Sequence, residues 1–241
     1  AWIWGLALPS ESVANLFCFT AHMSTENAWS AYGNDACRCI NSNLYNSIDL
    51  RDFRRHSWLD PDRKDPEKES YDYKSCRKEG KEYFNELPDY ANIKFRPAQG
   101  AYEDFKVGGA ADHPYMRVEE MYFTAAEAAL RSENLPNNVQ VARDLMNTVM
   151  AERDTRYNAN NRSGLNLGAT TTTWTGSLLE DILIQRRIEL WGEYGRLFDV
   201  RRLGQGIDRR TDDGFSEECI SMMNRRNVNI TKADTYNWVL T

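Results

Sequence analysis

The chain has 241 residues, of which 41% are hydrophobic and 27% charged, and its formal net charge at pH 7 is −6. This composition is typical of a globular protein that is large enough to bury a substantial core. The sequence contains no run of about 18 apolar residues, so no segment is predicted to cross a membrane as a helix. An acidic chain also differs from the basic proteins that bind nucleic acid without sequence preference, so we expect no nucleic-acid partner.

Both ends of the sequence are apolar. The chain starts with Ala1-Trp2-Ile3-Trp4 and stops in Trp238-Val239-Leu240-Thr241, with no initiator Met or leader before the first segment. We therefore expect the sequence to be part of a longer protein, and the lack of a targeting signal then says nothing about destination. Four tryptophans are expected in the core: Trp2, Trp4, Trp191 and Trp238.

The first 115 residues predict little regular structure. Residues 39–48 form one exception, because their apolar positions have helical spacing and predict a short helix. Between residues 60 and 115 five prolines interrupt a polar sequence, which favours surface loops. Residues 92–96 alternate as a short strand would. The five cysteines and three histidines do not form metal-ligand spacings, so neither a metal site nor a cofactor is expected.

Residues 116–205 have the periodicity of helices. Helices are predicted over 116–132 and 138–153, joined by a turn that contains Pro136, and they are similar to one tetratricopeptide-type pair. A third helix is predicted over 177–202, where Ser177 and Glu180 form a capping box. Its apolar stripe is too wide for a surface helix and must be covered on more than one side.

Charged residues are dense within this third helix. Four pairs of opposite charge stand three residues apart: Arg186/Glu189, Glu193/Arg196, Arg196/Asp199 and Asp199/Arg202. Glu189 and Glu193 could form an acid/base pair, but the arginines around them would hold both carboxylates ionised. A structural ion-pair network is therefore favoured over ligand contact or catalysis. Gly192 and Gly195 indicate a bend or the close approach of another backbone.

Two of these segments resemble one family. Residues 117–128, RVEEMYFTAAEA, are similar to the R-x-x-E-M-Y-L-x-x-A-E-A helix of SusD/RagB-like proteins. Residues 185–202 resemble that family's E-R-R-x-E-L-x-x-E-G-x-R-x-x-D-L-R-R segment, although Gln185 replaces the usual Glu and Leu197 a common aromatic. Weaker similarities cover Trp2–Gly5 and the stretch from Leu44 to Arg54.

The resemblance implies a mainly α-helical, SusD-like fold with tetratricopeptide-type helix pairs, long irregular loops and few short strands. Residues 1–241 would then be the C-terminal part of a single SusD-like domain: 1–115 a loop-rich, ligand-facing part, 116–205 a helical scaffold and 206–241 a C-terminal loop region. The N-terminal half of the same protein is expected as a structural partner.

The resemblance also implies a function. SusD-like proteins of Bacteroidota-type bacteria are cell-surface lipoproteins of the outer membrane that bind oligosaccharides, or peptides in some members. They deliver the ligand to a SusC-like TonB-dependent transporter, and they are not enzymes. Two alternatives stay open: a helical scaffold that binds only other proteins or peptides, and a carbohydrate-active enzyme, which would need two carboxylates about 5–10 Å apart in one cleft.

A sugar site needs exposed aromatic rings with polar groups beside them, since sugars have flat apolar faces bordered by hydroxyls. Three loops could supply such rings. The expected ligand-binding residues are Asn27, Trp29, Tyr32, Asn34 and Asp35 in the first loop, Trp58 in the second and Trp174 in the third. We favour the first loop, with Trp29 and Tyr32 as stacking residues, against the alternative that these rings serve packing. No catalytic residue is assigned.

Overall fold

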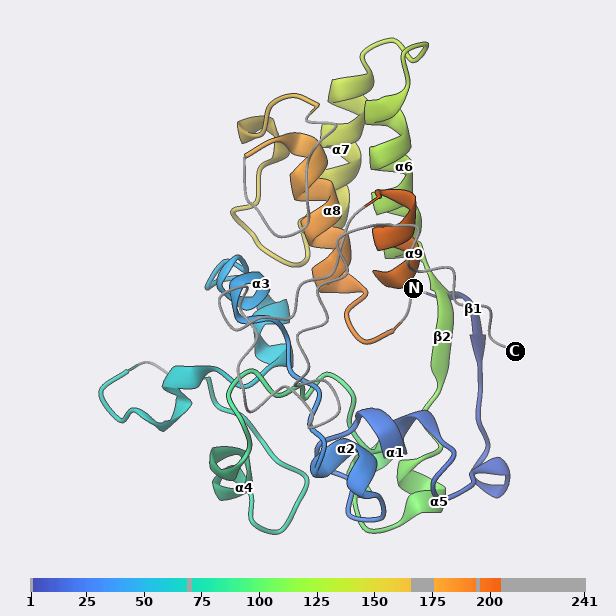
Figure 1. The fold of residues 1–241 in the computed structure, drawn as a ribbon, viewed down its shortest axis with the longest axis vertical. Helices are drawn as coiled ribbons and strands as arrows, with labels where there is room; N and C mark the ends of the chain where they lie inside the picture. Colours follow the sequence, from blue (N-terminus) through green and yellow to red (C-terminus); the bar gives the residue numbers. More distant parts are fainter. Residues whose placement is uncertain (1, 69–70, 166–175, 194–195, 205–241) are drawn as a thin grey trace.

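The computed structural model describes residues 2–68, 71–165, 176–193 and 196–204 (Figure 1). The described part is mainly α-helical, as predicted, and contains one two-stranded sheet. Three longer helices gather at one end of the molecule, and the loop-rich residues lie at the other end (Figure 1). No helix in the described ranges is long and apolar enough to span a membrane.

The three longer helices pack around the principal core. They are α6 (Val118–Arg131), α7 (Asn138–Met150) and α8 (Leu178–Glu189). Small side chains at Ala126 and Ala142 are completely buried and let α6 and α7 approach closely. The predicted helix pair over 116–132 and 138–153 is therefore confirmed to within a few residues at each end.

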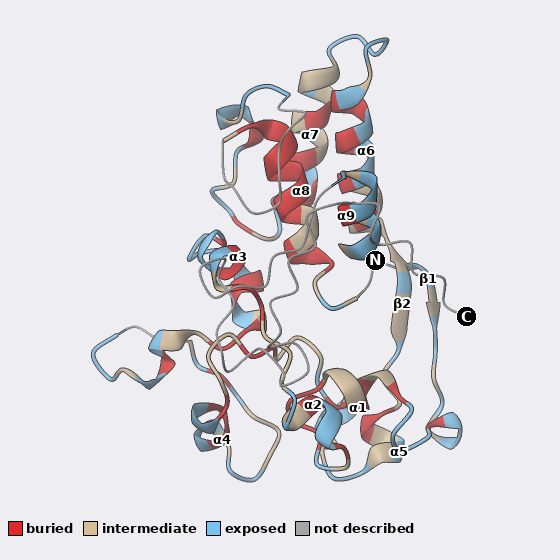
Figure 2. Ribbon diagram, in the orientation of Figure 1, coloured by how far each residue is buried: buried red, intermediate tan, exposed pale blue. Residues whose placement is uncertain are grey.

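Helix α8 is buried on two sides, as its wide apolar stripe predicts (Figure 2). Leu179 and Ile182 pack into the core shared with α6 and α7. Ile184 and Ile188 pack into a second core with Trp58 and the short helix α3 (Ser42–Asn46). The helix begins where expected, because the Ser177 hydroxyl accepts a hydrogen bond of 3.2 Å from the backbone N–H of Glu180.

The prediction of one continuous helix over 177–202 is wrong. Helix α8 ends at Glu189, residues 190–193 form turns, and α9 (Arg196–Arg202) is a separate helix. Gly192 lies between them with φ of +73°, and a Cβ there would lie 2.6 Å from a ring carbon of Phe95. The positive φ at Gly192 is not helical, and the Phe95 ring fills the space that a side chain there would need, so the expected bend is confirmed.

A two-stranded antiparallel ribbon joins the two ends of the molecule. Strand β1 (Trp2–Leu6) pairs with β2 (His113–Arg117), and Trp2 lies opposite Arg117. The prediction that Trp2 and Trp4 belong to the core is wrong, since they are 51% and 63% exposed. Strand β2 is mostly half-buried, with Phe19 packed against His113, whereas four of the five residues of β1 are exposed (Figure 2).

The loop-rich part contains only short helices. They are α1 (Phe19–Met23), α2 (Ala31–Asn34), α3, α4 (Lys81–Glu86) and α5 (Phe105–Gly108). Helix α3 confirms the helix predicted within 39–48. The predicted strand over 92–96 does not form: Asn92 makes a single bridge to Trp58, and its side chain bonds the carbonyls of Met23 and Arg38. The segment crosses between elements instead of running along a partner strand.

Candidate functional site

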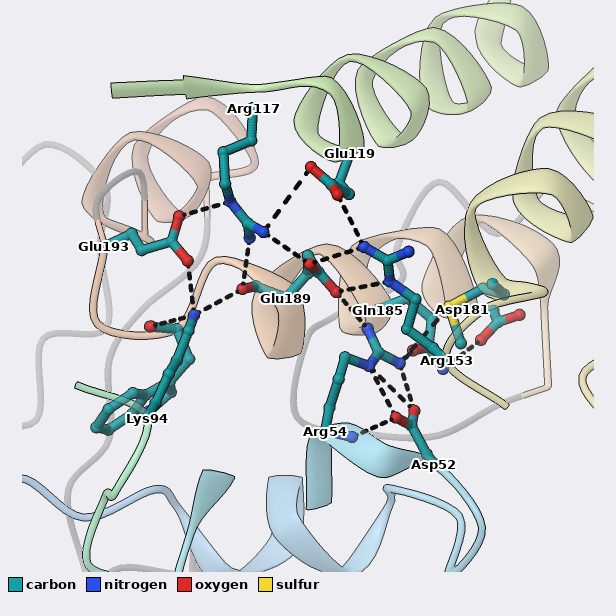
Figure 3. A network of polar contacts seen from close by, with 12 residues as sticks. Asp52, Arg54, Lys94, Arg117, Glu119, Arg153, Asp181, Gln185, Glu189 and Glu193 are labelled. Carbon is teal, nitrogen blue, oxygen red and sulfur yellow. Dashed lines mark hydrogen bonds and ion pairs between the residues drawn. The ribbon is translucent and has the colours of Figure 1, made fainter. Parts of the chain in front are cut away.

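The glutamates of the Arg-rich segment lie at the centre of a buried ion network (Figure 3). The Glu189 carboxylate accepts hydrogen bonds from Arg54 at 3.2 Å, Arg117 at 3.0 Å and Arg153 at 3.3 Å. Glu193 accepts from Lys94 at 2.6 Å and from Arg117 at 3.0 Å. The network thus joins the ribbon, α8 and two segments of the loop-rich part.

The charge balance of this network makes it unsuited to acid/base catalysis. Burial alone would raise the pKa of Glu189, but the charges of Arg54, Arg153 and Arg117 outweigh it and lower the pKa to about 2. A carboxylate with this pKa stays ionised at neutral pH and cannot serve as a general acid. We therefore interpret the network as structural.

The partners within the network differ from those that sequence spacing predicts. Arg186 pairs with Glu120 at 2.8 Å and with Asp199 at 3.2 Å, and not with Glu189 three residues away. Asp199 and Arg202 do pair, at 2.8 Å, as predicted. Spacing along one helix cannot anticipate these contacts, because the helix breaks before Arg196 and partners arrive from other elements.

In the first candidate loop, Asn27 has a structural role. Its side chain is completely buried, where the amide donates to the Ser24 carbonyl at 2.8 Å and its oxygen accepts from the Ser30 N–H at 2.9 Å. The expectation that Asn27 contacts a ligand is corrected on this ground. Asn34 donates to the Asn27 carbonyl at 2.9 Å and is half-buried, whereas Asp35 is exposed.

The two aromatic residues of this loop differ in exposure. Trp29 is half-buried against a small core at Val13, and a Cβ added at Gly108 would lie 2.6 Å from its ring. Tyr32 is 49% exposed, and its ring stacks on His22 with centroids 4.7 Å apart and planes 9° apart. One face of Tyr32 is therefore held by His22, and the ring has the outward position of a stacking platform.

Two residues beside Tyr32 were missed by sequence reasoning. His22 supports the ring, and its Nε2 atom lies 3.0 Å from the carbonyl oxygen of Leu16. Arg38 donates to the Tyr32 carbonyl at 3.0 Å, which places a guanidinium next to the platform. The sequence gives no signal for either contact. Arg38 stands between Cys37 and Cys39, and His22 lies in a segment without periodicity.

The other two candidate tryptophans do not extend this platform. Trp58 is 1% exposed and packs edge-to-face on Trp191 with ring centroids 5.6 Å apart. The expectation that Trp58 contacts a ligand is therefore corrected: the ring is part of the second core. Trp174 lies outside the described residues, as does Trp238.

A polar cleft of about 500 Å³ lies between residues 46–52 and residues 154–162. Asn161 and Arg162 line it together with Asp49 and Arg51. The sequence does not indicate that these residues meet, because the approach of α3 to the end of α7 depends on the tertiary fold. Among the residues that the structure describes, no cluster of three metal-ligating side chains is present.

These features define a class of protein: a helical scaffold with a tetratricopeptide-type pair, fastened by a buried ion network to a loop-rich part that carries the exposed ring. The family model described as "SusD family" matches residues 89–239, and the chain belongs to this family. The resemblance carried by residues 117–128 and 185–202 is thereby confirmed.

A solved structure agrees with this assignment. The chain is similar to a SusD-like carbohydrate binding protein from Bacteroides vulgatus ATCC 8482, with a TM-score of 0.52 and 21% sequence identity. The similarity covers 87% of this chain and 36% of that one, so the chain spans about a third of its structural relative. No curated protein gives a significant match. At this identity the likeness shows the fold alone.

Proposed function

We propose that the protein binds oligosaccharides at the bacterial cell surface, as an outer-membrane lipoprotein, and delivers them to a SusC-like TonB-dependent transporter. Membership of the SusD family is the observation that carries this proposal. The similarity in fold to a SusD-like carbohydrate binding protein from Bacteroides vulgatus supports it.

Tyr32 is the proposed stacking residue. Its ring is half-exposed and already held by His22, so a sugar that packs on the open face would not have to order a mobile side chain. Asp35 and Arg38 lie close to it in the chain and could bond the hydroxyl groups at the edge of the sugar. Trp29 and Asn34 would support the loop from below.

Calorimetry with a panel of oligosaccharides tests this proposal. We expect at least one oligosaccharide to bind, and Tyr32→Ala to weaken its affinity by about tenfold or more, because the apolar contact area is lost. Tyr32→Phe keeps the ring and should change affinity by less than about threefold. The matched control is Tyr115→Ala, which removes another exposed tyrosine, 43% exposed, from the ribbon.

Two results would count against the proposal. Absence of binding to every oligosaccharide, with an intact circular dichroism spectrum, would exclude glycan binding and leave a peptide or protein ligand. Equal losses for Tyr32→Ala and Tyr115→Ala would remove Tyr32 from the site. Transporter association is tested separately, by co-purification of the tagged whole protein with a SusC-like transporter from the same bacterium.

A further inference from the structure

The polar cleft between α3 and the end of α7 differs from an ordinary solvated surface in its volume and in the charges that line it. Its volume of about 500 Å³ is in the range of small-molecule sites. Segment 46–52 forms one wall, segment 154–162 the other, and Met150 and Gln185 also line it. The cleft does not include Tyr32 or His22, so it is separate from the proposed stacking platform.

The lining carries four guanidinium groups against three carboxylates, although the whole chain has a net charge of −6. The three carboxylates are paired within the protein. Asp49 and Asp154 both lie near Arg51, at 3.1 Å and 3.8 Å. Asp52 pairs with Arg54, at 2.5 Å. The negative charge of the cleft is thus already balanced.

Three of the four arginines of the lining are also engaged. Arg51 holds the two aspartates, and Arg162 lies 3.7 Å from the buried Asp181. Arg55 pairs with Asp60 at 3.3 Å and donates to two backbone carbonyls of the α3 region. These contacts hold the two walls in place and balance the charge of the three guanidinium groups.

Arg156 differs from the other three. It is exposed, it lines the cleft, and its guanidinium makes no ion pair with any residue in the described ranges. A turn fixes its backbone, since the Arg156 N–H donates to Asp154 at 2.9 Å. Asn161, also exposed, presents an amide from the same wall. The cleft therefore has one surplus cation beside groups that can bond hydroxyls.

We propose that this cleft binds the carboxylate of an acidic sugar residue of the uronic-acid type, with Arg156 as the carboxylate ligand. A guanidinium offers two parallel N–H donors that match the two oxygens of a carboxylate. The Asn161 amide and the Asp49 carboxylate would bond the hydroxyls of the same ring. The inference rests on the proposed glycan binding and adds a class of sugar to it.

The experiment compares α-1,4-linked trigalacturonate with its fully methyl-esterified form, by calorimetry on the whole protein at low and at high salt. The ester has the same skeleton without the charge. We expect the acid to bind about tenfold more tightly, with a preference that shrinks as salt rises. Arg156→Gln should reduce this preference to within about twofold. Lys106→Gln, which removes an exposed cation outside the cleft, should leave it intact.

The outcomes separate this inference from the function on which it rests. Equal affinity for acid and ester, or a preference that survives Arg156→Gln, overturns the inference while glycan binding stands. Binding of neutral oligosaccharides but of neither trigalacturonate form has the same meaning. Failure of every oligosaccharide to bind overturns both. Because Arg156 is exposed, unchanged thermal unfolding of Arg156→Gln is expected, and it ensures that a lost preference reflects the cleft.

Discussion

Arg54 and Glu189 are separated by 135 positions in the sequence, yet their side chains form an ion pair at 3.2 Å with only 6% of each exposed. This contact ties a turn of the loop-rich part to the end of α8 (Figure 3). Arg54 also donates to Asp52 and Gln185, and Glu189 accepts from Arg117 and Arg153. The charges in this region depend on one another, so removing one of them affects several partners.

Glu189→Gln is expected to lower the free energy of unfolding by about 3–5 kcal/mol. The substitution leaves several buried guanidinium groups without their shared counter-charge, and uncompensated buried charges are costly. Denaturant unfolding followed by circular dichroism measures the loss. The control is Glu133→Gln, an exposed glutamate beyond the end of α6, which should change stability by less than about 0.5 kcal/mol.

Stability should fall in acid because of the same residue. The pKa of Glu189 is about 2 in the folded protein, below its ordinary value of 4.5, so the folded state binds this proton less readily than the unfolded state. The stabilisation is therefore complete above about pH 5 and is lost as pH falls toward 2, amounting to roughly 3 kcal/mol. Unfolding measured across this range should show a steeper pH dependence for the natural chain than for Glu189→Gln. Parallel curves would contradict the assignment.

Gly192→Ala should destabilise the protein by about 2–4 kcal/mol. The new Cβ would meet Phe95 at 2.6 Å and the Met23 methyl group at 3.0 Å, in a backbone conformation with φ of +73°. Gly164→Ala is a matched control, because Gly164 has a similar φ of +78° but no heavy atom within 4 Å of the added Cβ. It should cost only about 1 kcal/mol. Equal thermal shifts in the two variants would show that the packing against Phe95 does not matter.

Trp58→Ala should mainly reduce stability, whereas Tyr32→Ala should mainly reduce sugar affinity. Trp58 is 1% exposed within the second core, so its removal should cost about 3–5 kcal/mol of stability. Tyr32 is half-exposed, and its removal should cost less than about 1 kcal/mol while it weakens sugar binding. Thermal unfolding and calorimetry on the same two variants distinguish a core ring from a platform ring.

Helical periodicity predicted the scaffold well, because α6 and α7 have long, regular patterns whose small residues permit close packing. It failed at the end of α8, where the pattern continues through Gly192 but Phe95, from a distant loop, enters the space beside the chain. Likewise, Trp2 and Trp4 are apolar enough for a core, yet the ribbon leaves them exposed. Composition gives a residue's preference for burial but does not show which elements will be available to cover it.

The candidate site was less predictable for a related reason. Tyr32 was identified because an aromatic residue in a polar loop is a recognisable pattern, but the supporting contact with His22 could not be anticipated. Trp58 fits the same pattern and is nevertheless buried, since Ile184 and Ile188 of α8 pack into the same core. The cleft at Arg156 has no linear signature, because its walls come from segments about a hundred residues apart.

The pairing of β1 with β2 places Leu6 beside His113, so the residues between them form one long connection whose two ends are held together. The ion network attaches this long connection to the end of α8 at two further points, Arg54 and Lys94. With its ends fixed, a doubling of any flexible loop inside it would cost only about 0.6 kcal/mol of closure entropy. Evolution could therefore lengthen or replace the turn that displays Tyr32, and so change the surface offered to a ligand, without redesigning the helices underneath.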